Sequence, residues 1–211
     1  MKVLLVLLLV PTAQASLIID FTTLPANTAN QTYNGYSGGT INGVPFTNLI
    51  CDDYNHDTKF PSGDLQYNME TINQVSSARF GSTSAATATY QRAALLLAGD
   101  GTASLRGLDH VTSTADVASY QYALWNLLTP GSPAYGTSAA LLSTVNAEDL
   151  NRASFASTYD QLRIYTPVGA SVSNQEFLQL SRVPEPGSVA LAGFALMALA
   201  VGARRARRVK S

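Results

Sequence analysis

The sequence predicts an α+β domain placed between an N-terminal export signal and a single C-terminal transmembrane helix. Short apolar stretches separated by turn residues begin the body of the chain and return at its end, which is typical of strands. Between them, apolar residues recur every three or four positions, as they do on one face of a helix. The last part of the chain is an uninterrupted apolar run followed by arginines, the pattern of one membrane-spanning helix.

Residues 1–15 have the composition of a secretory signal peptide. Lys2 precedes the apolar run from Val3 to Val10, and the small residues of Ala13-Gln14-Ala15 follow. The apolar run is too short for a spanning helix, so we expect cleavage between Ala15 and Ser16. The exported body would then comprise residues 16–182.

The first part of the body is expected to be rich in strands. Residues 17–21 form a short apolar stretch, and Asn42-Gly43 supplies the positive φ angles of a tight hairpin turn. The stretch from Val44 to Ile50 should therefore be a hairpin strand that ends at Cys51. Cys51 is the only cysteine of the chain, which excludes an intramolecular disulfide and zinc sites built from several cysteines.

The middle of the body is expected to be helical. Ser113 and Asp116 resemble a capping box at the start of one helix, and Pro130 should end it. A Ser/Ala/Thr-rich linker separates the first two predicted helices. The predicted helices are 65–75, 90–97, 113–129 and 138–160, the last interrupted near Asn146, followed by strands at 162–165 and 177–180. Strands, helices and strands in this order predict the α+β class: a β-rich body with a central helical segment.

Gln121 interrupts the apolar stripe of the third predicted helix. At 100° per residue it lies about 40° from Val117 and about 60° from Leu124, so its side chain should be buried. A buried amide without partners is unfavourable by a few kcal/mol. We therefore expect Gln121 to bond a specific group, for which a neighbouring backbone carbonyl would be sufficient.

The body is acidic, although the chain as a whole is nearly neutral. Between the signal and the tail, 7 basic residues stand against 13 acidic ones, a net charge of −6, whereas the whole chain has −1. This charge argues against nucleic acid or anionic lipid as a partner of the body. Its length suits one domain with its own core.

The C-terminal segment, residues 183–211, contains three elements in a fixed order. They are Pro184-Glu185-Pro186, an apolar run from Gly187 to Ala203, and the basic cluster Arg204, Arg205, Arg207, Arg208 and Lys210 within 204–210. This order resembles the PEP-CTERM sorting signal of exosortase substrates. The resemblance implies a membrane-anchored protein that exosortase processes near the Pro-Glu-Pro motif and passes to the cell surface or the medium. A plain single-pass anchor with its basic cluster in the cytoplasm is the alternative.

Two short motifs of the body resemble the thioester domains of bacterial surface adhesins. Ile50-Cys51-Asp52-Asp53 is similar to their cysteine motif, and the segment 120–125, which contains Gln121, is similar to their Gln-x-x-apolar-aromatic motif. In that family the thiol displaces ammonia from the glutamine amide, so the resemblance implies an internal thioester between Cys51 and Gln121. Such a bond acylates an amine or hydroxyl on a target. The alternative is that Cys51 is a small apolar core residue.

Two other arrangements have weaker support. The acidic stretch Asp52, Asp53, Asn55 and Asp57 has oxygen ligands for calcium but lacks the Gly and distal Glu of a helix-loop-helix calcium site. Cys51 with His110 and a nearby aspartate, Asp109 or Asp116, would suggest a hydrolase, but no hydrolase signature surrounds them. We therefore expect neither a metal nor a cofactor.

Together these features predict a non-enzymatic, exported protein of the cell surface or extracellular matrix. Its expected partners are exosortase, the export machinery, the membrane, and surface amines, hydroxyls or exopolysaccharide, with no nucleic acid. A structural or carbohydrate-associated matrix protein without a thioester is the alternative, and a secreted hydrolase is the third candidate.

Overall fold

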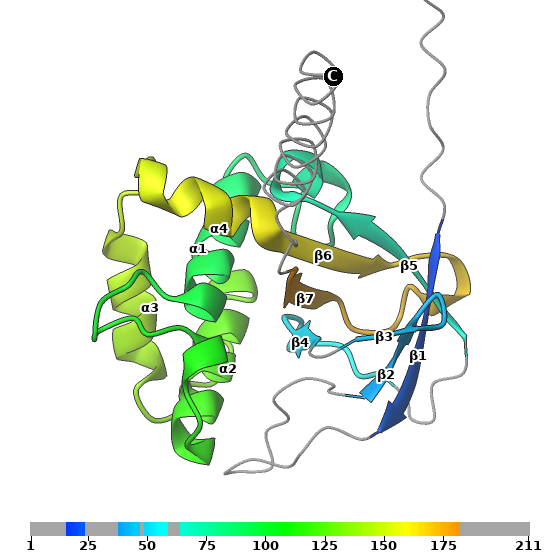
Figure 1. The fold of residues 1–211 in the computed structure, drawn as a ribbon, viewed down its shortest axis with the longest axis horizontal. Coiled ribbons are helices and arrows are strands. Elements are labelled where there is room, and N and C mark those ends of the chain that lie inside the picture. Colours follow the sequence, from blue (N-terminus) through cyan, green and yellow to red (C-terminus); the bar gives the residue numbers. More distant parts are fainter. Residues whose placement is uncertain (1–15, 24–37, 47–48, 59–63, 182–211) are drawn as a thin grey trace, which may run out of the picture. The chain divides into compact units, whose positions relative to one another are not determined.

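The computed structural model describes residues 16–23, 38–46, 49–58 and 64–181. The chain divides into two compact units, 1–180 and 181–211, and nearly all described residues belong to the first. Within this unit, strands from both ends of the sequence form one sheet, and helices from the middle of the sequence lie beside it (Figure 1).

The sheet has seven strands, and every neighbouring pair is antiparallel. Their order is β3 (Val44–Pro45), β2 (Gly38–Ile41), β1 (Leu17–Thr23), β5 (Leu65–Glu70), β6 (Leu162–Pro167), β7 (Phe177–Leu180) and β4 (Ile50–Cys51). Asn42 and Gly43, with φ of 50° and 78°, form the predicted turn between β2 and β3. β4 is an edge strand whose neighbour is β7, so its outer backbone groups face the helices or solvent.

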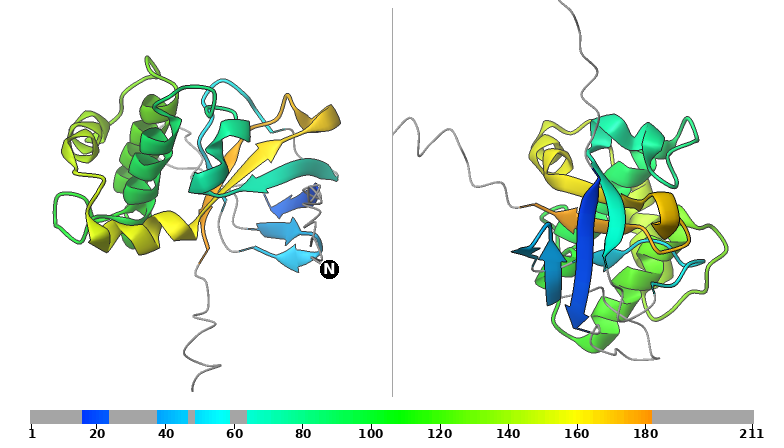
Figure 2. Two further views of the ribbon diagram at one scale, coloured as in Figure 1. Left: turned by 90° about the horizontal axis from the view of Figure 1, so that it is seen from above. Right: turned by 90° about the vertical axis from the view of Figure 1, so that its right-hand side faces the viewer.

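The other regular elements of the described chain are four α-helices and several short 3₁₀ helices. The α-helices are α1 (Ala86–Ala98), α2 (Thr114–Leu128), α3 (Ser138–Ala147) and α4 (Ala156–Gln161). The 3₁₀ helices are η2 (Ile72–Ser77), η3 (Leu108–His110), η4 (Ala153–Phe155) and η5 (Gly169–Ser171). Figure 2 shows α1, α2 and α3 grouped on one side of the sheet, with α4 leading into β6.

Two hydrophobic cores pack against the sheet. The first joins the helices to apolar residues of β4, β6 and β7, including Ile50, Ile164 and Leu178. The second contains Cys51 and large aromatic residues of β1, β5, β6 and β7. Because side chains alternate between the faces of a strand, the adjacent residues Ile50 and Cys51 enter different cores. β4 therefore connects the helical half of the molecule to the sheet.

The predicted fold class is wrong in its membrane helix. In the described part of the chain no helix has the length and hydrophobicity needed to cross a membrane. The longest, α2, has 15 residues, fewer than the ~20 that a bilayer requires, and its buried face packs into the core of the domain. The helix expected over 187–203 lies outside the described residues. What the structure shows is a mixed α/β protein with a seven-stranded antiparallel sheet.

Two further elements differ from the prediction. The helix expected at 65–75 is instead strand β5 followed by the 3₁₀ helix η2. The strand expected from Val44 to Ile50 is two short strands, β3 and β4, which lie at opposite edges of the sheet. Both errors arise where partners distant in sequence decide the conformation, as β1 and β6 do for β5.

Candidate functional site

Cys51 lies at the end of β4, where the edge strand meets helix α2 (Figure 1). It pairs with Phe177 of β7, and its side chain is 4% exposed within the second core. It is a free cysteine. The thiol therefore sits in a dry, aromatic environment and does not contact solvent.

Gln121 approaches Cys51 from α2. This helix begins where Ser113 accepts a hydrogen bond from the backbone N–H of Asp116 at 3.1 Å, which confirms the predicted N-cap. Gln121 lies two turns further on and is 0% exposed, as its place on the apolar stripe predicted. Its side-chain amide donates a hydrogen bond of 2.5 Å to the backbone carbonyl of Cys51, 70 positions earlier in the chain. The two residues that the motifs singled out are thus in direct contact.

Two polar atoms at this contact have no hydrogen-bond partner among the described residues. One is the side-chain oxygen Oε1 of Gln121, and the other is the indole nitrogen Nε1 of Trp125. Both atoms are buried, and a buried polar group without a partner costs about 1–3 kcal/mol. The site therefore holds an acceptor, Oε1 of Gln121, that has no donor, and an indole N–H that lies near the Cys51 thiol and lowers its pKa.

The Cys51 thiol is held in its neutral form. Burial raises its pKa well above the ordinary range, and the negative charge of Asp52 raises it further. A bond of 3.4 Å from the thiol to the backbone carbonyl of Asp53, together with the nearby indole of Trp125, lowers the pKa by less. Because the thiolate is the reactive form, the free thiol should be inert toward reagents in solution while the protein is folded.

An aromatic row covers the contact. Trp125 packs edge-to-face against Tyr54, with ring centroids 5.3 Å apart, and against Tyr122 at 5.2 Å. Tyr122 in turn stacks on Tyr135 at 5.4 Å. Tyr54 is 41% exposed, so the row extends from the buried site to the surface. A target that reaches Gln121 from this side would have to pass these rings.

A cluster of buried carboxyl groups lies beside the site. Glu176 accepts hydrogen bonds from the Tyr90 hydroxyl, the Thr166 hydroxyl at 2.6 Å and the Arg79 backbone N–H at 2.7 Å. Burial, and then the charge and hydrogen bond of Glu176, raise the pKa of Asp52 well above its usual range. Burial also raises the pKa of Glu70, which shares the Thr166 hydroxyl. The protonated form of Asp52 is therefore favoured by the fold, because burial and the nearby Glu176 both raise its pKa.

This cluster could not be predicted from the sequence. Glu70 lies in β5, Thr166 in β6 and Glu176 directly before β7, and these segments become neighbours only in the folded sheet. The one local signal was an acidic residue at the end of each of two apolar strand stretches, where a buried charge would require partners.

Arg79 connects three segments around Asp53. Its guanidinium contacts the Asp53 carboxylate and donates to the backbone carbonyl of Val172 at 2.6 Å. Asp53 is 1% exposed and also lies 2.8 Å from the ring nitrogen Nδ1 of His56. Its carboxylate further accepts from the Asn55 N–H at 3.0 Å. These contacts fix the loop that follows Cys51.

The structure does not assemble the two weaker sites. Asp52 and Asp53 bond different partners, and no group of three His, Cys, Asp or Glu side chains among the described residues is placed to hold a metal ion. His110 is exposed in η3, and Asp116 lies in the first turn of α2, five positions before Gln121. No described contact joins either of them to Cys51.

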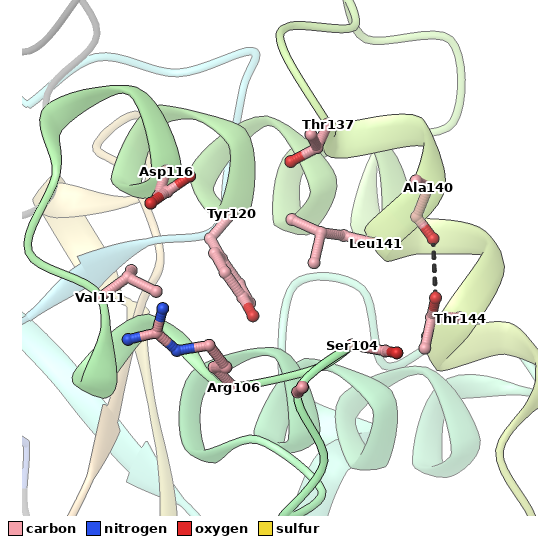
Figure 3. A pocket seen from close by; sticks show the side chains of 10 residues that line it. Ser104, Arg106, Val111, Asp116, Tyr120, Thr137, Ala140, Leu141 and Thr144 are labelled. Atoms are coloured by element: carbon pink, nitrogen blue, oxygen red, sulfur yellow. Dashed lines mark hydrogen bonds between the residues drawn. The ribbon is translucent and has the colours of Figure 1, made fainter.

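A separate cavity of about 460 Å³ opens between α2, α3 and the loop before η3 (Figure 3). Arg106 and Tyr120 line it, with Asp116, Leu141 and Thr144 among the others. Tyr120 precedes Gln121 but faces this cavity, where its hydroxyl accepts a hydrogen bond from the Gly107 N–H at 3.1 Å. The cavity contains neither Cys51 nor Gln121 and forms no part of their contact.

The remaining predicted residues lie almost entirely outside the described part. This holds for Ala15, for Pro184, Glu185 and Pro186, and for the basic cluster Arg204, Arg205, Arg207, Arg208 and Lys210. Ser16 is described and exposed just before β1. No protein-family model, no curated protein and no solved structure matches the chain.

Proposed function

We propose that the chain is an exported protein of the cell surface or extracellular matrix that forms an internal thioester between Cys51 and Gln121. The observation that carries the proposal is the 2.5 Å hydrogen bond from the Gln121 amide to the Cys51 backbone, with both side chains buried. This contact holds the amide beside Cys51, whose thiol can displace its ammonia. The thioester would tether the protein covalently to a surface amine or hydroxyl.

Burial supports this chemistry in two ways. A thioester excluded from water is protected from hydrolysis, and holding two reacting groups together replaces an encounter in solution by an intramolecular step.

One observation favours the alternative of a structural or carbohydrate-associated matrix protein without a thioester. Cys51 lies on an edge strand, so its carbonyl needs a partner outside the sheet when it is buried. The Gln121 amide supplies that partner. In this case Gln121 has only a structural role, and its side chain remains an intact amide.

Treatment with methylamine in denaturant and measurement of the intact mass separate the two functions, because unfolding exposes a buried thioester to the amine. We expect the protein to gain one methylamine at Gln121 and to release one free thiol at Cys51 as the thioester opens. Cys51→Ser serves as the control, because its hydroxyl is a similar size but a poorer nucleophile, and it should take up no amine. Absence of methylamine uptake by the wild-type protein would contradict the thioester.

Export and sorting form a separate part of the proposal, supported by the three elements of residues 183–211. Replacing Pro184-Glu185-Pro186 by alanines should leave an unprocessed, cell-associated form in a strain that has exosortase. Pro133→Ala, at an exposed position of the body, is the matched control and should be processed normally. Immunoblotting of cell and medium fractions measures both; normal processing of the triple variant would show that the motif is not the signal.

A further inference from the structure

The contact between Cys51 and Gln121 leaves one buried donor and one buried acceptor unused. The acceptor is Oε1 of Gln121, and the donor is Nε1 of Trp125. Buried indole N–H groups normally find an acceptor, so an unused one beside a reactive pair requires an explanation. Neither atom makes a hydrogen bond of normal geometry with a described residue, although the indole N–H lies near enough to the Cys51 sulfur to lower the pKa of that thiol.

The helix places these two side chains next to each other. Gln121 and Trp125 are four residues apart on α2, so they lie on the same face, one turn apart. Side chains on a helix lean toward its N-terminus, which directs the indole of Trp125 back over Gln121. Trp125 also packs against the second core, which contains Cys51. The indole is therefore close to both reacting residues.

The aromatic neighbours hold the indole in this position. Tyr54 and Tyr122 pack edge-to-face against Trp125, with interplanar angles of 61° and 79°. A donor whose orientation is fixed before the reaction stabilises a developing charge without having to reorganise. The packing thus supplies the preorganisation that a catalytic donor needs.

Formation of the thioester creates a charge that requires such a donor. The sulfur of Cys51 attacks the Cδ carbon of Gln121, an S–C bond forms, and the electron pair of the C=O bond moves onto Oε1. The thiol proton passes to Nε2, the C–N bond breaks, and ammonia leaves as the C=O bond returns. In the tetrahedral intermediate the negative charge lies on Oε1, the atom that has no donor in the described structure.

We propose that the indole N–H of Trp125 donates a hydrogen bond to Oε1 of Gln121 in this intermediate and is a catalytic residue for thioester formation. The proposal rests on the thioester function above and assigns the group that activates the carbonyl. Before the reaction this N–H lies near the Cys51 sulfur, and Oε1 becomes its stronger acceptor only when that oxygen is charged.

The test follows ammonia loss over time. The full chain is purified unfolded, with Gln121 intact, and diluted from denaturant, and the intact mass is recorded at intervals. Trp125→Phe keeps an aromatic ring against Tyr54 and Tyr122 but removes the N–H, so formation should slow by roughly 10²- to 10³-fold. Tyr54→Phe, which keeps all rings and the indole, is the matched control and should form the thioester at the wild-type rate.

A second measurement does not depend on the folding of the phenylalanine variant. Trp125 is the only tryptophan of the chain, so growth on fluorotryptophan changes this one side chain. Fluorine makes the indole N–H a stronger donor, and formation should become faster than with tryptophan. An unchanged or slower rate would overturn the assignment.

The outcomes separate the two proposals. A wild-type chain that folds and keeps its full mass overturns the thioester and, with it, the role of Trp125. A wild-type chain that loses ammonia, together with a folded Trp125→Phe chain that loses it at the same rate, overturns the role of Trp125 alone.

Discussion

Asp52 and Glu176 are two buried carboxyl groups, and Glu176 lies close enough to raise the pKa of Asp52. Burial and the neighbouring Glu176 raise the pKa of Asp52, while hydroxyl and N–H donors surround Glu176. The folded protein therefore binds a proton at Asp52 that the unfolded chain releases above about pH 4. This difference makes the stability of the fold depend on pH.

The expected effect has a definite sign. Since the native state binds more protons, the free energy of unfolding falls as pH rises from about 4 toward the raised pKa of Asp52, by up to about 1.4 kcal/mol per pH unit. Asp52→Asn removes this titration and should flatten the profile above about pH 4. Urea unfolding at a series of pH values measures it, and equal slopes for variant and wild type would contradict the raised pKa of Asp52.

Gln121 shows how far single residues could be predicted. Its position on an apolar stripe indicated burial and a bonded amide, and both are confirmed, the partner being the Cys51 carbonyl. Trp125 belonged to the same motif, yet nothing in the sequence distinguished its indole from a packing residue. The hydrogen-bonding surroundings of a side chain depend on groups that only the folded structure brings together, so they leave no pattern in the local sequence.

Arg79 acts at the level of elements, because it joins the loop after β4 to the loop between β6 and β7. Arg79→Ala would leave the Asp53 carboxylate buried without its guanidinium, which typically costs 3–5 kcal/mol. We expect a loss of about that size in chemical denaturation. Adding Asp53→Asn should recover part of the lost stability, because the buried side chain at position 53 then carries no charge. A change in the single variant below about 0.5 kcal/mol would show that the pair is not important for stability.

The segment 65–75 shows why one predicted helix was wrong. Leu65, Met69, Ile72 and Val75 have helical spacing, but the first two pack against the second core and the last two belong to the first. They therefore do not form one stripe. The segment becomes a strand because β1 and β6 pair with both of its edges, and pairing between distant segments overrides local periodicity. The cap of α2, which depends on adjacent residues, was predicted correctly.

At the scale of the whole molecule, the order of the sheet brings Cys51 and Gln121 together. β4 pairs with β7, more than a hundred residues later, and this places Cys51 at the edge that faces α2. Strands at both ends of the body and helices between them were visible in the sequence. Which strand lies beside which was not, because side-chain alternation specifies a buried face but does not name a partner.

The proposed thioester requires that ammonia has left Gln121 and that the side-chain carbonyl of Gln121 is bonded to the sulfur of Cys51. The most direct test is the intact mass of freshly purified protein, unfolded in acidic denaturant without reductant or amine. Alkylation of the folded protein is not sufficient, because burial protects a free thiol as well as a thioester. We predict a mass one ammonia below that of the processed sequence, while Cys51→Ser and Gln121→Ala each show their full mass. A wild-type protein at full mass with a free Cys51 would contradict the internal thioester.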